Sequence, residues 1–504
     1  MTVSATFDDA FPRTEETNGK KIGNELVLAF TERPGLQRLH FVYLRIVKKE
    51  GRMNFLSSLG KNIGQILFVS LMILIMMMTT TGVSASLFAK EPTIEKLKTD
   101  LRSPKANTRR KAAKALGQTF SRDATPPLLV AADDKDVGVR REIVKALGLL
   151  RDESAITILL TSLNDEASSV RQESIVALVN LYIEQDVGFS LSRQAKRLYK
   201  KINPFTDQVR RDSTVIEPDV VVGPAVIDAI AERLSDSNKS ICLYAANALG
   251  VLRAQSAISQ MVASMKTGSA DLRVACMRSF YKIKDRSVDE YILIYLNDTN
   301  KAVRDEAILT LGLFKSLKAL PQLQALYDQN PDTKLRGRAL EALSLVGDAG
   351  SLDLFRRNLR DPDHRYRQFA AEGIGRVGDG SMVEEVSRIF LAEKKLSTQL
   401  ALSFALFQLG RPEYLDKLVS SLKNRFHHDQ SEAYLLELGL ATASELVKYL
   451  DDNNPRIRQR LCRVLGLIGD SASVESLKPL MQDTDADVVL EAALAIRRIG
   501  ARQS

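Results

Sequence analysis

The stretch Val139-Arg140-Arg141-Glu142-Ile143-Val144-Lys145-Ala146-Leu147-Gly148 decides the fold of this chain, because close variants of it recur along the sequence. They stand at 303–312, 335–344 and 457–466, and each keeps an Arg at its second position. This Arg serves as an anchor, and most successive anchors are 31 or 32 residues apart. The twelve anchors are Arg109, Arg140, Arg171, Cys242, Arg273, Arg304, Arg336, Arg367, Gln399, Ser431, Arg458 and Val489. A fixed period of this length is typical of repeat proteins whose units pack only on their neighbours.

Apolar residues around each anchor follow a helical period. An apolar residue precedes most anchors, small residues follow at three and six positions, and a large apolar residue follows at seven. The last group is Leu116, Leu147, Leu178, Leu249, Phe280, Leu311, Leu343, Ile374, Leu406, Leu438, Leu465 and Ile496. This spacing predicts an amphipathic helix after each anchor. Many anchors are followed by an Ala after six residues and a Gly after eight residues. These small residues leave little side-chain volume on one face of the helix, so we expect a neighbouring helix to approach closely there.

An Asp stands six residues before many anchors, as Asp134 does before Arg140. In a polar turn ahead of an apolar run, such a carboxylate predicts a helix start, because it accepts hydrogen bonds from unpaired backbone N–H groups. Upstream of each Asp lies another apolar segment, for example 155–163, long enough for a further helix. Each unit is therefore predicted to be a helix, a turn and a second helix.

At these residues the chain resembles the HEAT-like repeat family, in the short form of about 30 residues found in phycobilisome lyase-type repeats. The resemblance covers 91–504 apart from an insertion at about 186–223. It implies an all-α fold, an α-solenoid that forms a superhelix of about twelve HEAT-like helix pairs.

The resemblance also implies a structural ladder between adjacent units, in which the turn Asp meets the Arg of a second helix. Its expected members are Asp134, Asp165, Asp298, Asp361 and Asp452 with Arg140, Arg171, Arg304, Arg367 and Arg458. Cys242, Gln399, Ser431 and Val489 depart from the pattern in the Arg slot, and Asn330, Glu393 and Arg425 depart from it in the Asp slot. We interpret the ladder as a stacking device and not as an active site.

An apolar run at 66–78, broken only by Ser70, lies near the N-terminus. It is short for a membrane helix of about 20 residues, but it suits a secretory core of about 7 to 15 followed by small residues. We expect 53–85 to be a signal peptide that starts at Met53 and is cleaved after Ala85, with 1–52 an extension upstream of the true start. The alternative is an uncleaved signal anchor at about 63–83; a buried helix of a cytosolic protein is a third interpretation. The first two place the solenoid outside the cytoplasm, in the periplasm if the source is bacterial.

The insertion carries the densest positive charge, although the net charge of +9 is spread over the chain as a whole. Its basic residues interleave with apolar ones at helical spacing; they are Arg193, Lys196, Arg197, Lys200 and Lys201. A basic amphipathic helix of this kind would suit an anionic partner or a membrane surface. The alternative is a solvated helix on a loop.

No pattern in the sequence carries catalysis or a cofactor. Cys242, Cys276 and Cys462 lack the spacing of a disulfide framework or zinc site. His427 and His428 are poorly placed to share a metal, and no His-Glu pair recurs as in HEAT-like metal hydroxylases. His364 and Tyr366 flank a turn, and a phosphate loop and a GxSxG elbow are absent.

We therefore expect a protein that is not an enzyme, needs no cofactor or metal, and acts as a scaffold binding protein partners on the concave face of the solenoid. One alternative is a bilin lyase or chaperone, which the repeat subtype alone suggests. Another is a nucleic-acid-binding HEAT protein, which conflicts with the export signal and lacks a continuous basic stripe.

Overall fold

The computed structural model describes residues 93–183, 216, 220–330 and 332–502. Within these ranges the chain consists of α-helices, short 3-10 helices and turns, with no β-strand. The prediction of an all-α fold is confirmed. The predicted segments 1–52 and 53–85 and most of the insertion lie outside the described residues, so these domain assignments stay predictions. Among the described helices, none is both long enough and apolar enough to cross a bilayer.

Twelve helix pairs follow one another in the described chain. The first helices are α3 (Ile94–Asp100), α5 (Thr125–Val130), α7 (Ile156–Ser162), α11 (Pro224–Glu232), α13 (Ile258–Thr267), α15 (Asp289–Leu293), α17 (Leu320–Gln329), α19 (Leu352–Asn358), α21 (Val383–Ala392), α23 (Leu415–Ser420), α25 (Ala443–Val447) and α27 (Ser471–Leu477). The second helices are α4 (Ala106–Gln118), α6 (Val137–Leu150), α8 (Ser168–Asn180), α12 (Lys239–Val251), α14 (Ala270–Ile283), α16 (Lys301–Leu313), α18 (Thr333–Val346), α20 (His364–Val377), α22 (Leu396–Gln408), α24 (His428–Leu438), α26 (Pro455–Ile468) and α28 (Ala486–Ala501).

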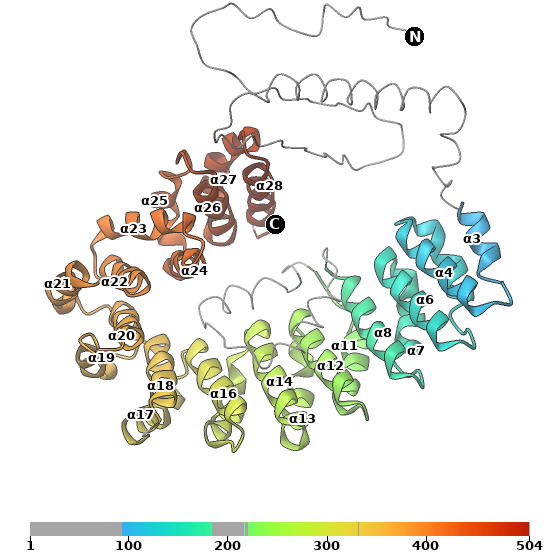
Figure 1. Cartoon of the computed structure of the whole chain (residues 1–504), viewed down its shortest axis with the longest axis horizontal. Helices are drawn as coiled ribbons and strands as arrows, with labels where there is room; N and C mark the ends of the chain where they lie inside the picture. The colour runs from blue at the N-terminus through green and yellow to red at the C-terminus, as the bar shows by residue number, and fades with distance from the viewer. Residues whose placement is uncertain (1–92, 184–215, 217–219, 331, 503–504) are drawn as a thin grey trace, which may run out of the picture. The chain divides into compact units, whose positions relative to one another are not determined.

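Short 3-10 helices lead into or extend most first helices. They span Arg122–Ala124, Glu153–Ala155, Arg233–Ser235, Gln255–Ala257, Arg286–Val288, Ile294–Asn297, Leu317–Ala319, Ala349–Ser351, Gly380–Met382, Pro412–Tyr414, Ser421–Lys423, Leu440–Thr442 and Lys478–Gln482. Each second helix packs on the next, from α4 on α6 to α26 on α28. Figure 1 shows the pairs in single file, with the second helices along the inner side of a curved row and the first helices along the outer side.

The insertion does not interrupt the stacking. Helices α8 and α12 pack directly on each other although the insertion separates them in sequence. Arg171 of α8 makes a bidentate ion pair with Asp236, whose carboxylate oxygens lie 2.7 and 2.8 Å from the guanidinium nitrogens. Ile216, near the end of the insertion, is buried, and its N–H donates to the carbonyl of Val251 at 2.9 Å. The repeat therefore continues through this point in its ordinary geometry.

The predicted core positions are buried in ten of the twelve units. Ten side chains of that series are fully buried, whereas Leu438 and Ile496 are only partly buried. In α24 the fully buried large side chains are Tyr434 and Leu435, three and four residues after Ser431. In α28 the core contact passes to Ile499, because within the described residues no further repeat covers the face that carries Ile496.

Close helix contact explains the Gly at eight residues after many anchors. A Cβ placed on Gly148 would lie 2.7 Å from both Cα and Cβ of Ala177 on α8. The equivalent Gly117 meets Ala146 of α6 at the same distance. Non-bonded carbon atoms in proteins do not approach within 2.7 Å, so a side chain at these positions would force the two helices apart.

The predicted helix start is displaced by two residues. Asp136, and not Asp134, is the N-cap of α6, and its side chain accepts from the N–H of Val139. Asp134 instead accepts from the N–H of Asp136 at 2.8 Å and so shapes the turn before the cap. The prediction of a capping role for Asp134 is therefore wrong, because a cap must directly precede the first helical residue, here Val137.

Candidate functional site

The anchor Arg of one unit joins its own turn to the turn of the next. Nε and Nη2 of Arg140 lie 2.7 and 2.9 Å from the two carboxylate oxygens of Asp165, while Nη1 donates to the carbonyl of Asp134 at 2.9 Å. Planar guanidinium suits this arrangement, because its donors form a fixed fork. The side chains of Arg140 and Asp165 are both nearly buried. One residue thereby sets the distance and the angle between two units.

Five further units pair the anchor Arg with a carboxylate of the next turn, four of them through two nitrogens and Arg273 through a single ion pair at 3.2 Å. The pairs are Arg109–Asp134, Arg171–Asp236, Arg273–Asp298, Arg367–Glu393 and Arg458–Asp483. Together with Arg140–Asp165 they form the ladder. Glu393 takes the place of Asp, and its longer side chain still reaches both nitrogens of Arg367 at 2.8 and 3.0 Å.

The remaining predicted members lack a cross-unit carboxylate contact among the described residues. Arg304 donates to the carbonyls of Asp298 and Thr299, because Asn330 stands in the next Asp slot. Asp361 and Asp452 accept from the N–H two residues later in their own turns. Gln399 and Cys242, in the Arg slot, keep only the contact with their own turn carbonyl.

Ladder carboxylates are held in their charged form. Burial by itself raises the pKa of Asp165, but hydrogen bonds from Arg140 and from the Ala167 N–H outweigh it and lower the pKa below its ordinary value. Burial likewise raises the pKa of Asp134, but hydrogen bonds from Arg109 and from the Asp136 N–H outweigh burial and lower this pKa below its ordinary value. The ladder therefore stays ionised at neutral pH and serves stacking.

A second set of charges lies on the faces of the second helices that point away from the first helices. We call the residues one, two and five places after each anchor the inner positions. Cross-unit ion pairs there join Arg278 to Glu306 at 2.8 Å, Arg460 to Glu432 at 2.8 Å and Arg463 to Glu491 at 2.6 Å. These pairs tie neighbouring second helices together along the inner side of the row.

The most buried polar cluster surrounds Glu372 on α20, whose side chain is fully buried. The hydroxyl of Tyr434 donates to its Oε1 at 2.6 Å, and Gln368 donates to the same atom at 3.0 Å. Its Oε2 lies 3.6 Å from Arg376, which makes its closer, bidentate contact with Glu437 at 2.8 and 2.9 Å. Burial raises the pKa of Glu372 to about 7, and Arg376 only partly offsets the effect. A group that titrates near neutrality is thus enclosed between α20 and α24.

The first two second helices present a different inner surface. Arg110, Lys111 and Lys114 of α4 and Arg141 and Lys145 of α6 are all exposed. We call these five residues the basic face. Arg141 lies 3.5 Å from Glu142, and Arg110 donates to Asn107 at 3.1 Å. No ion pair or side-chain hydrogen bond joins Lys111, Lys114 or Lys145 to any described residue.

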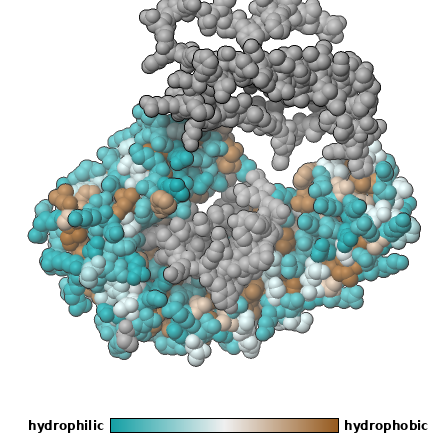
Figure 2. Space-filling model, viewed as in Figure 1, coloured by the Kyte–Doolittle hydropathy of each residue, from teal (hydrophilic) through white to brown (hydrophobic). Residues whose placement is uncertain are grey.

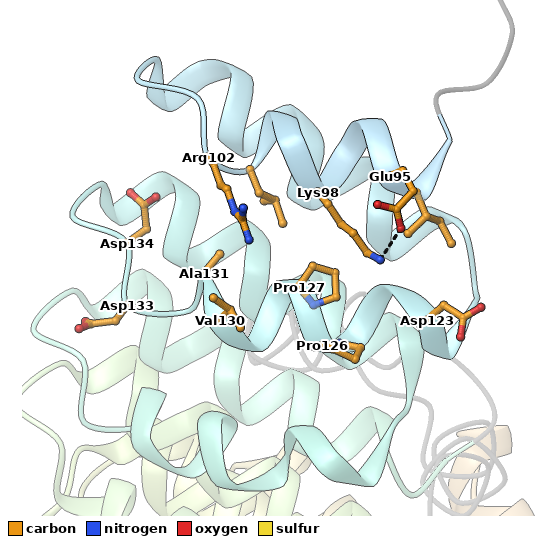
Figure 3. Close-up of a pocket in the computed structure, with 12 residues that line it drawn as sticks. Glu95, Lys98, Arg102, Asp123, Pro126, Pro127, Val130, Ala131, Asp133 and Asp134 are labelled. Atoms are coloured by element: carbon orange, nitrogen blue, oxygen red, sulfur yellow. Dashed lines mark hydrogen bonds and ion pairs between the residues drawn. The ribbon is translucent and has the colours of Figure 1, made fainter.

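A groove of about 860 Å³ runs between α3 and α5 on the outer side. Figure 3 shows Pro126, Pro127 and Val130 of α5 along one wall and Lys98 and Arg102 near the other, with Lys98 turned toward Glu95. A second groove, of about 740 Å³, is lined by the ladder pair Arg458–Asp483 and by Asp452. Figure 2 shows a mostly hydrophilic described surface on the face in view, with apolar residues scattered over it.

Several predicted site residues play no part in these clusters. Arg193, Lys196, Arg197, Lys200 and Lys201 lie outside the described residues, so their role stays a prediction. His428 lies 3.0 Å from Asp429, and the hydroxyl of Tyr366 donates to the carbonyl of Thr333. The three Cys are buried free thiols. In the described part of the chain, no group of three or more His, Cys, Asp or Glu residues could hold a metal ion.

A profile described as HEAT repeats matches the chain at 94–179, 288–375 and 443–504. The chain contains HEAT repeats. These regions carry eight of the twelve anchor residues, and they include three of the six ladder pairs in full: Arg109–Asp134, Arg140–Asp165 and Arg458–Asp483. The resemblance drawn from the anchor pattern is thereby confirmed.

Two curated relatives are deoxyhypusine hydroxylases. The HEAT-repeat chain is 27% identical to that of Candida albicans over 219 residues, which is 42% of this chain and 68% of the relative. It is 35% identical to that of Saccharomyces cerevisiae over 91 residues, which is 18% of this chain and 28% of the relative. This similarity contradicts the expectation that the protein is not an enzyme.

Two solved structures resemble this chain at low sequence identity. Importin beta is 12% identical, with a TM-score of 0.43, over 83% of this chain and 66% of its own. The complex of CpcE and CpcF of phycocyanin lyase from Nostoc sp. PCC7120 is 19% identical, with a TM-score of 0.25, over 56% of this chain and 93% of its own.

Proposed function

We propose that the HEAT-repeat solenoid is a scaffold that binds protein partners along the inner positions of its second helices. The observation that carries the proposal is the ladder, which fixes the angle between the units that it joins and so turns the same face of their second helices in the same direction. A partner can then contact several units at once. Because the ladder fixes the surface before binding, little conformational entropy is lost when a partner docks.

Site-specific photo-crosslinking in intact cells tests this proposal. A photoreactive amino acid at Gln118 of α4 or Leu149 of α6, each nine places after its anchor, samples the helix face that carries the inner positions, and one at Ile294 or Leu317 samples exposed sites at the first helices. We expect defined protein adducts from the two inner sites and none from the two outer sites. Adducts from the outer sites alone, or from no site, would contradict the proposal.

The similarity to deoxyhypusine hydroxylases favours a second candidate function, a hydroxylation reaction like that of these relatives. The purified chain would be incubated with a protein substrate that contains deoxyhypusine. Mass spectrometry of the substrate then decides: the gain of one oxygen atom supports the second candidate, and an unchanged mass contradicts it.

We also propose that the solenoid is exported or held at the non-cytoplasmic side of a membrane. The support is the sequence pattern of 53–85 alone, an apolar core followed by small residues. N-terminal sequencing of the native protein tests it: a first residue Ser86 supports cleavage, and recovery in the cytosolic fraction with an intact N-terminus contradicts export.

A further inference from the structure

We propose that the basic face on α4 and α6 is the docking site for an acidic segment of a protein partner. The inference rests on the proposed scaffold function and assigns one part of the solenoid to one kind of ligand. Its ligand would carry several carboxylates within a short stretch of chain, as Glu-rich and Asp-rich peptides do.

Repeat geometry brings the positive charges of the basic face into one row. Lys114 and Lys145 occupy the same place in successive units, and so do Arg110 and Arg141. The helices beneath them are in direct backbone contact, because Gly117 of α4 leaves room for Ala146 of α6. Helices packed this way lie about 8 Å apart, so one peptide can reach the charges of both.

The lysines of the basic face differ from the basic residues farther along the inner positions. Arg278, Arg460 and Arg463 each contact a Glu of a neighbouring unit, and Glu306 and Glu432 are almost fully buried in these pairs. Lys111, Lys114 and Lys145 are exposed and have no such carboxylate among the described residues. Helix α4 contains no acidic residue at all. Among the described residues, no ion pair therefore compensates the positive charge of these three lysines, which attracts an anion.

The size and borders of the basic face favour an acidic peptide over nucleic acid or a membrane. Glu142 lies inside it, and the equivalent positions of the next unit are Gln172, Glu173 and Val176. A long phosphate backbone that continued past Lys145 would meet the carboxylates of Glu142 and Glu173. An acidic peptide can match the short row and also place an apolar side chain against the half-buried Leu149.

Fluorescence anisotropy with the full chain and a labelled oligoglutamate peptide tests the proposal. The variant Lys111→Glu, Lys114→Glu, Lys145→Glu reverses the three unpaired lysines. The control Lys266→Glu, Lys394→Glu, Lys423→Glu changes the net charge equally at three exposed lysines elsewhere. We expect the first variant to weaken binding by about tenfold or more and the control by less than about twofold, because exposed charge contacts contribute modestly one by one but add along a row. Binding should also weaken as salt concentration rises.

Two outcomes overturn the assignment. One is equal loss of binding in the variant and the control, which would mean that only net charge matters. The other is tighter binding of a labelled oligothymidylate, or of vesicles containing phosphatidylserine, with loss in the first variant alone, which would assign the basic face to nucleic acid or to membrane.

If peptide binding is lost only in the first variant while photo-crosslinking finds no protein partner, the scaffold function fails and the docking site stands. If partners crosslink normally in that variant, the docking site fails and the scaffold stands.

Discussion

A single Arg per unit couples two neighbouring turns. Arg140 binds the carboxylate of Asp165 in the next unit and the carbonyl of Asp134 in its own unit. Both contacts are nearly buried, so removing the guanidinium leaves an ionised carboxylate without its partner. The cost of an unpaired buried charge exceeds the gain from forming the pair.

Arg140→Ala should lower the free energy of unfolding by about 2 kcal/mol, because it strands the carboxylate of Asp165. The matched control is Arg304→Ala, whose guanidinium contacts only backbone carbonyls among the described residues and should cost less. Urea unfolding followed by circular dichroism gives both values. Equal losses in the two variants would show that the carboxylate contact adds nothing.

The buried Glu372 should make stability depend on pH near neutrality. Its pKa of about 7 lies above the value of 4.5 for an exposed Glu, so between these values the folded chain holds a proton that the unfolded chain has released. The free energy of unfolding therefore falls as pH rises through this range and levels off above it.

Glu372→Gln removes this titration while keeping the shape of the side chain. We expect the variant to be more stable than the parent above pH 7, by an amount on the order of 2 kcal/mol, and to lose that advantage toward pH 4.5. Urea midpoints of both proteins across this pH range provide the measurement. A constant difference between the two proteins at every pH would contradict the raised pKa.

At the scale of the helix pair, close packing of second helices depends on residues without side chains. Gly148 lies against Ala177 of α8, while Gly380, at the start of a 3-10 helix, has no atom within 4 Å of the Cβ position. A Gly→Ala substitution would therefore clash with a neighbouring helix at position 148 and would meet open space at position 380.

Gly148→Ala should destabilise the fold by about 1–3 kcal/mol, because the added methyl group forces α6 and α8 apart. Gly380→Ala should be neutral or slightly stabilising, because it only restricts the unfolded chain. Thermal and urea unfolding of the two variants compare these effects. A destabilisation by Gly380→Ala as large as that by Gly148→Ala would refute the packing argument.

At the scale of the whole molecule, the described units form a linear array in which each second helix packs on the next, and the contacts Glu372–Tyr434 and Arg376–Glu437 also reach one unit further. The ladder is interrupted at α24, where Ser431 replaces the anchor Arg and Arg425 the turn Asp. There the ion pairs Arg376–Glu437 and Arg460–Glu432 join α24 to α20 and α26. Ion pairs between second helices thus take over the stacking role of the ladder.

Arg460→Ala should raise hydrogen exchange in α24 and α26 and leave α4 to α8 unchanged. Glu432 is 1% exposed in its side chain and would keep only the distant Arg463 at 3.9 Å. In a linear array such a defect stays local. Hydrogen–deuterium exchange with mass spectrometry resolves the segments. Faster exchange spread evenly along the chain would show that the solenoid unfolds as one cooperative unit.

Sequence by itself determined the repeat, the helix pairs and most buried positions, because a residue that recurs every 31 places at helical spacing must face the same neighbour in each unit. It also located the anchor Arg and the turn Asp. Tertiary structure decided which Arg meets which Asp, why Glu393 can serve as a turn carboxylate, and that Asp136 and not Asp134 caps α6. It alone brought Glu372 to Tyr434, 62 residues away, and left the lysines of α4 and α6 exposed. Local patterns fix what is periodic along the chain, whereas ion pairs, burial and exposure depend on how far each unit is turned against the next.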